Sequence, residues 1–193
     1  MADRERRAQF DAEASQASRW QQAAREFVLA ANYLIDWYDP PHDPGDRSDL
    51  AWLHSGSTVP MMVLYAAAIE NLLKAILVAK GEDLVANGRL KPQFGHHRLL
   101  EYARDAGLES PAEVEQLLQC LSHVLYAGRN PSATTHAGSA DASALAYPAD
   151  VERVWSLLEH LESLLRATGT PCLPAVDLRA RYRPPGYDVP LRR

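Results

Sequence analysis

The stretch MMVLYAAAIENLLKAILVAK, residues 61–80, is the most apolar part of the chain and decides its fold class. Its apolar residues recur at helical spacing on one broad face, and more of them lie on the opposite side, as in a helix at the centre of a bundle. Pro60 fits the first turn of this helix and Gly81 its end. Three polar residues stand in its middle: Glu70, Asn71 and Lys74. Because such side chains would be costly at the centre of a bilayer, the pattern favours a buried core helix over a membrane span.

Helical periodicity continues through most of the chain, and no segment reads convincingly as a strand. A first helix is predicted from about Phe10 to Tyr38, with the apolar seam of a long helix that lies nearly antiparallel to its neighbours. The prolines and glycine of residues 39–49 end that helix. Three further helices are predicted after the central one: His96 or His97 to Ala106, Pro111 to Gly128, and Pro148 to Ala167.

The predicted fold is therefore an all-α, five-helix, up-and-down bundle. It forms one domain over residues 1–169, followed by an irregular, arginine-rich tail over residues 170–193. The helix that begins at Pro111 has the sequence signature of a capping box, with Ser110 as the N-cap and Glu113 as its partner three residues later.

Charge and cysteine content narrow the class of protein. The chain carries 20 basic and 25 acidic residues and a formal net charge of −5, so any contact with nucleic acid must be local. Residues 178–193 hold five arginines, either as a basic arm or, the interpretation we favour, as a solvated tail. Cys120 and Cys172 form no metal-ligand pattern, and the charged N-terminus lacks the apolar core of a signal peptide. A reduced, cytoplasmic protein is expected.

The histidines and acids form no recognisable metal-binding pattern. His96 and His97 are adjacent, so their side chains would diverge on a helix, and one of them is expected to cap the helix that follows. Residues 39–46 contain His42 and three aspartates without a usual ligand spacing. The sequence also lacks GxSxG, GxxxxGK and GxGxxG, which sets serine hydrolases and phosphate-loop proteins aside. No metal and no cofactor are expected.

The segment YAGRNPSATTH, residues 126–136, follows a predicted helix and combines an arginine, an asparagine and a histidine. A histidine can donate or accept a proton near neutral pH, and an arginine can hold a phosphate through two hydrogen bonds. RNA cleavage needs little more, because the 2′-hydroxyl of the substrate is itself the nucleophile. Arg129, Asn130 and His136 are therefore the candidate catalytic residues.

This segment resembles the signature of the HEPN superfamily (higher eukaryotes and prokaryotes nucleotide-binding), all-helical domains that often act as ribonucleases. The signature is an arginine, commonly followed by Asn, Asp or His, and then a histidine after roughly four to six residues. Here Asn130 follows Arg129, and six residues separate Arg129 from His136.

Two further motifs resemble the same superfamily, in the same order along the chain. AAAIENLLKAILVAKG carries the Glu-x3-Lys pattern of its second helix as Glu70 and Lys74, and GHHRLLEYARDAG resembles the opening of its next helix. The match spans residues 59–167. The resemblance implies a HEPN-like bundle in which Glu70 and Lys74 lie on the substrate side of the site or support it. A plain ion pair on a partly buried helix face is the alternative for these two residues.

The resemblance implies a metal-independent endoribonuclease, of the kind found in toxin–antitoxin or phage-defence systems. His136 would act as general acid or base, Arg129 would stabilise the pentacovalent phosphate, and Asn130 would polarise or position it. A homodimer is implied, with RNA as the substrate and an antitoxin or defence protein as a further partner; no membrane partner is expected. Because Pro131 follows Asn130, and GRNP resembles a version of the motif without a histidine, a non-catalytic, HEPN-like dimeric binding or assembly module remains the alternative.

Overall fold

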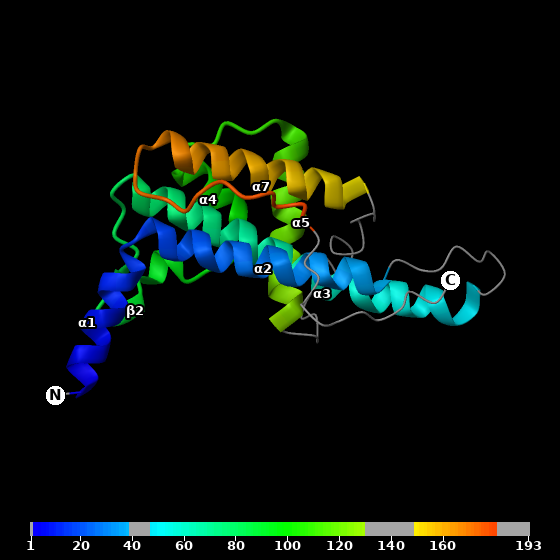
Figure 1. The fold of residues 1–193 in the computed structure, drawn as a ribbon, viewed down its shortest axis with the longest axis horizontal. Helices are drawn as coiled ribbons and strands as arrows, with labels where there is room; N and C mark the ends of the chain where they lie inside the picture. The colour runs from blue at the N-terminus through cyan, green and yellow to red at the C-terminus, as the bar shows by residue number, and fades with distance from the viewer. Residues whose placement is uncertain (1, 39–46, 130–148, 181–193) are drawn as a thin grey trace.

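α-Helices form most of the described chain (Figure 1). The computed structural model describes residues 2–38, 47–129 and 149–180, and for residues 2, 36–38, 47–59, 127–129 and 149 it describes the backbone alone. Six α-helices lie within these ranges: α1 (Ala2–Ala14), α2 (Ala17–Tyr38), α3 (Arg47–Ala79), α4 (Leu99–Asp105), α5 (Ala112–Arg129) and α7 (Ala149–Ala167). The predicted all-α class is confirmed.

α3 lies at the centre of the fold and contacts α2, α4, α5 and α7. α2 runs antiparallel beside it, α7 lies along the pair and α5 crosses behind them (Figure 1). The buried side of α2 includes Ala17, Ala24 and Ala31, which are at most 3% exposed and let the two long helices approach closely. The stretch Pro60–Ala79 is long and apolar enough to cross a membrane, but 72% of its most apolar window is buried inside the bundle. This stretch is the core helix that the sequence predicts.

The helix boundaries differ from the predicted ones in two places. The first helix, predicted from Phe10 to Tyr38, is interrupted at Ser15 and Gln16, whose side chains donate to the Ala12 carbonyl at the end of α1. α3 begins at Arg47 rather than at Pro60, so this proline lies inside the helix. A proline removes one backbone hydrogen bond, and here the residues before it are helical nevertheless.

A small hairpin joins α3 to α4, where no strand was predicted. β1 (Val85–Ala86) pairs antiparallel with β2 (Arg89–Leu90). The turn residues Asn87 and Gly88 have φ angles of 55° and 75°, and Asn-Gly is a strong sequence signal for a two-residue hairpin turn. The short 3-10 helix η1 (Pro92–Phe94) follows and leads the chain to α4.

The segment after α7 returns along the bundle, over α2 and α7 (Figure 1). The Leu173 N–H donates to Gln21 Oε1 at 2.6 Å, and the Asn32 amide donates to the carbonyls of Leu178 and Ala180 at 2.9 and 3.2 Å. Leu178 is buried, and the Arg179 guanidinium binds two carboxylates of α7. The interpretation as a solvated tail is therefore wrong for Leu178, whereas Arg179 is exposed although its guanidinium is paired; residues 181–193 lie outside the described ranges.

Candidate functional site

A buried ion pair on α3 forms the base of the candidate site. Lys74 Nζ lies 2.5 Å from Glu70 Oε1, and the two residues are 5% and 7% exposed. The pair forms at the predicted i,i+4 spacing, but it is more deeply buried than expected. Lys74 Nζ also lies 5.3 Å from the ring centre of Trp20 and 5.4 Å from that of Tyr102, whose π faces attract a cation. These contacts offset part of the cost of burying an ammonium group.

His97 completes this group from the loop before α4. Its Nδ1 lies 2.7 Å from Glu70 Oε2, so the two oxygens of Glu70 serve two different partners. A carboxylate only accepts hydrogen bonds, and Glu70 pairs through its other oxygen with the Lys74 ammonium. The proton in the His97–Glu70 hydrogen bond is therefore on Nδ1. Nε2 is the atom left for other partners, and it makes no hydrogen bond to the residues that the structure describes.

Tyr102 and His96 fix the backbone that carries His97. The Tyr102 hydroxyl lies 2.7 Å from the carbonyl oxygen of Phe94 and 2.8 Å from that of His96. Burial, and then the negative charge of Glu70, raises the pKa of this hydroxyl, so it stays protonated and donates. The His96 ring stacks on Tyr102 with 4.7 Å between the ring centres, and its Nδ1 accepts the Arg98 N–H at 3.2 Å. The N-cap of α4 is Arg98, which makes no side-chain capping hydrogen bond, so the expected histidine cap is not formed and the His96 ring only accepts the N–H of the N-cap residue.

A pocket of about 670 Å³ opens between α4 and α5, beside this group. Its basic and imidazole side chains are His96, His97, Arg98, Arg104 and His123, and its other lining residues are Gly95, Leu100, Glu101, Gln119, Ser122 and Tyr126. Ser122 Oγ accepts the Leu99 N–H at 2.9 Å and so ties the start of α4 to α5. This contact holds the two walls of the pocket together.

The arginines of the pocket are paired only at the surface. Arg98 lies 3.0 Å from Glu101, and Arg104 lies 3.4 Å from Glu115, with 69% and 60% of the two arginine side chains exposed. Exposed pairs of this kind contribute little to stability and exchange readily. A phosphate can therefore compete with Glu101 and Glu115 for the two guanidinium groups.

The predicted arginine–histidine motif begins at the edge of this pocket. Arg129 is the last residue of α5, one turn beyond Tyr126, which lines the pocket. The backbone of Arg129 lies on the helix face that carries Ser122, seven positions earlier. Asn130 and His136 lie outside the described residues, as does the Arg129 side chain. The structure thus brings Glu70 and Lys74 together with His97, and it places only the backbone of Arg129.

His97 is the residue that the sequence did not single out for chemistry. Its partner Glu70 is 27 residues away, and their contact depends on how the loop before α4 packs on α3. The only available signal was the Gly-His-His sequence in front of a predicted helix. Among the residues that the structure describes, no three histidine, cysteine or acidic side chains are placed to hold a metal ion.

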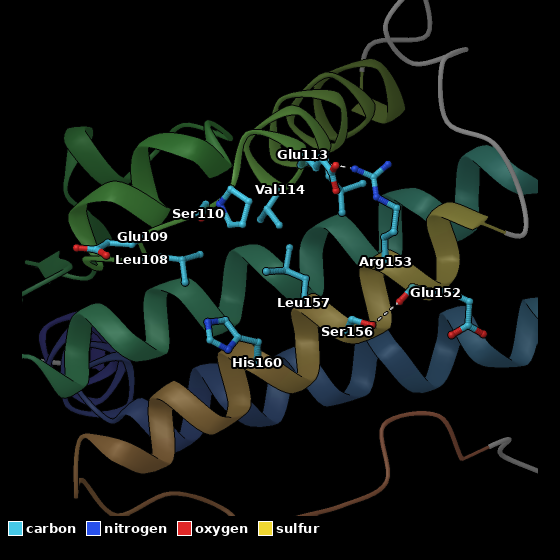
Figure 2. Close-up of a pocket in the computed structure, with 12 residues that line it drawn as sticks. Leu108, Glu109, Ser110, Glu113, Val114, Glu152, Arg153, Ser156, Leu157 and His160 are labelled. Carbon is cyan, nitrogen blue, oxygen red and sulfur yellow. Dashed lines mark hydrogen bonds between the residues drawn. The ribbon is translucent and has the colours of Figure 1, made fainter.

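A second, smaller pocket of about 350 Å³ lies between the start of α5 and α7 (Figure 2). Leu157 of α7 faces Val114 across it, and Arg153 reaches over to the carbonyl of Glu113 at 2.8 Å. Ser110 Oγ is buried there and makes no hydrogen bond to the described residues, so the predicted serine cap of α5 is not formed. α5 begins at Ala112, and the Pro111 carbonyl accepts the Glu115 N–H.

No protein-family model, curated protein or solved structure matches this chain. The functional interpretation therefore depends on the geometry of the pocket between α4 and α5 and on the sequence motifs around it. This pocket differs from the smaller one in its basic lining and in its position at the end of α5.

Proposed function

We propose that this protein is a HEPN-type, metal-independent endoribonuclease that cleaves RNA by attack of the 2′-hydroxyl and acts as a homodimer in a toxin–antitoxin or phage-defence system. The observation that supports it is the basic pocket between α4 and α5, at the edge of which Arg129 ends α5. A phosphodiester needs cationic hydrogen-bond donors and groups that transfer protons, and both kinds line this pocket.

The pocket suits a phosphodiester although the chain as a whole is acidic. Two arginines and three histidines stand around it against one glutamate, Glu101. Such a local excess of basic groups attracts a polyanion whatever the net charge of the protein. In a homodimer, a second pocket would add to this field.

In this proposal the residues of the motif act on the phosphate. Arg129 stabilises the negative charge that builds on the pentacovalent phosphorus, Asn130 positions the phosphate, and His136 transfers a proton. Glu70 and Lys74 support the site from α3 through His97, which lines the pocket.

RNA cleavage by the purified protein in EDTA tests this function. The wild type is compared with Arg129→Ala, His136→Ala and the control His160→Ala, which changes an exposed histidine of α7. We expect cleavage to persist in the chelator, to fall by about 10²–10⁴-fold in the first two variants and to be unchanged in the control. Circular dichroism checks that each variant is folded. A wild type that binds RNA without cutting it would instead indicate a non-catalytic binding module.

A further inference from the structure

We infer that His97 is a catalytic residue of this reaction, the general base that takes the proton of the 2′-hydroxyl, and that Glu70 is its positioning residue. This inference rests on the proposed function and adds a residue from outside the arginine–histidine motif. It follows from three contacts: Lys74 with Glu70, Glu70 with His97, and His97 with the pocket.

The first step is the orientation of the imidazole. Glu70 Oε2 lies 2.7 Å from Nδ1 and holds the proton there, which makes Nε2 the lone-pair atom of the neutral ring. Carboxylate–imidazole pairs of this kind fix the tautomer and the ring orientation of general bases in enzymes of unrelated folds. The His97 side chain is 20% exposed, which is enough to meet a ligand in the pocket.

The second step is the role of Lys74. A buried carboxylate needs a positively charged partner, because an unpaired charge in the interior is costly. Lys74 supplies that partner at 2.5 Å, and the ring centres of Trp20 and Tyr102 lie 5.3 and 5.4 Å from its ammonium nitrogen. An ion pair that served stability alone could use both oxygens of Glu70 for Lys74. Here one oxygen instead binds His97, which lines the pocket.

The third step is the balance of the reaction. His97 Nε2 takes the proton of the 2′-hydroxyl while O2′ bonds to phosphorus, and the bond from phosphorus to O5′ breaks. O5′ receives a proton from water or from the general acid of the proposed ribonuclease. The products are a 2′,3′-cyclic phosphate and a 5′-hydroxyl. His97 then returns its proton to water, so no metal, oxidant or reductant is consumed.

His97→Asn separates catalysis from structure. The amide nitrogen of asparagine takes the position of Nδ1 and can still donate to Glu70, but nothing replaces Nε2. We expect the rate constant for cleavage of a mixed-sequence, single-stranded RNA to fall by about 10²–10⁴-fold, with KM within about threefold of the wild type. Glu70→Gln should also lower the rate constant, by up to about 10⁴-fold, because an amide no longer fixes the proton on Nδ1. His160→Ala is again the control.

The pH profile and chemical rescue provide readouts that a structural role would not move. The acidic limb of the wild-type profile should be lost in His97→Asn, whose charged and titratable surroundings are otherwise kept: Glu70, Lys74, Tyr102, His96, Glu101 and His123. Imidazole added to His97→Ala should restore part of the rate, because a free base can occupy the space. Nitrogen NMR of the wild-type histidines should show the proton of neutral His97 on Nδ1, and Glu70→Gln should alter this tautomer.

The outcomes distinguish the two proposals. If the wild type cleaves RNA and the cleavage rate of His97→Asn is within about threefold of it, the catalytic role of His97 is wrong. The proposed ribonuclease function is then still supported. A His97 tautomer with the proton on Nε2 overturns the role as well. If the wild type cleaves no RNA, the proposed function is wrong, and so is the catalytic role of His97 that depends on it.

Discussion

At the scale of single residues, Gly88 shows how little room the fold leaves beside α1. Its N–H donates to Asp11 Oδ1 at 2.9 Å, and a Cβ at this position would lie 2.6 Å from Arg7 Cγ. Gly81 also has a positive φ, but a Cβ there would meet none of the described atoms within 4 Å. Gly81→Ala should therefore cost about 1–2 kcal/mol for the left-handed backbone alone. Gly88→Ala should cost about 1–3 kcal/mol more, because it also overpacks the contact with α1.

Urea unfolding followed by circular dichroism measures both losses. The comparison is matched, since the two variants share the backbone strain and differ in the steric contact. Equal losses in Gly81→Ala and Gly88→Ala would contradict a close approach of the hairpin to Arg7.

Only those contacts of the candidate site that form between residues close in sequence could be predicted. Glu70 and Lys74 lie one turn apart on one helix, so their pairing follows from sequence spacing alone. Their depth of burial depends on Trp20 and Tyr102, which come from α2 and α4. His97 reaches Glu70 across 27 residues, and no local rule predicts such a contact.

At the scale of helices, Glu162 holds α7 to α2. Its carboxylate is 2% exposed and accepts hydrogen bonds from Gln21 at 2.7 Å and from the Arg25 guanidinium at 2.8 and 2.9 Å. Glu162→Ala would leave the partly buried Arg25 and the buried Gln21 without their partner, so we expect a loss of about 3–5 kcal/mol in the free energy of unfolding. Glu159→Ala, one turn earlier on the exposed side of α7, should change it much less.

Denaturant unfolding with an unchanged m-value would show that Glu162→Ala weakens the fold without altering its cooperativity. A loss no larger than that of Glu159→Ala would mean that Gln21 and Arg25 find other partners.

Helix boundaries were harder to predict than the helices themselves. The apolar periodicity that predicts α2, α5 and α7 does not change at Ser15 or at Pro60, where breaks depend on side-chain hydrogen bonds and on what precedes the proline. The hairpin carried a readable signal, Asn87-Gly88, but each of its strands is two residues long and shows no alternation. The all-α class follows from periodicity because α3, apolar on several faces, requires helices around it.

At the scale of the whole molecule, a chain with a net charge of −5 is proposed to bind RNA through one basic pocket. Few phosphates would then be neutralised, and binding should depend only moderately on salt. For single strands the slope of log K against log salt is about −0.7 per phosphate contact, so two to four contacts give roughly −1.4 to −2.8. A protein that used a long basic surface would show a much steeper slope.

The salt dependence can be traced to the pocket with His97→Asn, which should bind RNA without cutting it quickly. Replacing Arg98 and Arg104 together by alanine in this background should reduce the slope by about 1.4, because two phosphate contacts are lost. Arg19→Ala, an exposed arginine of α2 outside the pocket, should leave it unchanged. Fluorescence anisotropy of a labelled single-stranded RNA at several salt concentrations measures the slope. If it stays the same without Arg98 and Arg104, the RNA binds elsewhere on the molecule, and the pocket between α4 and α5 is not its site.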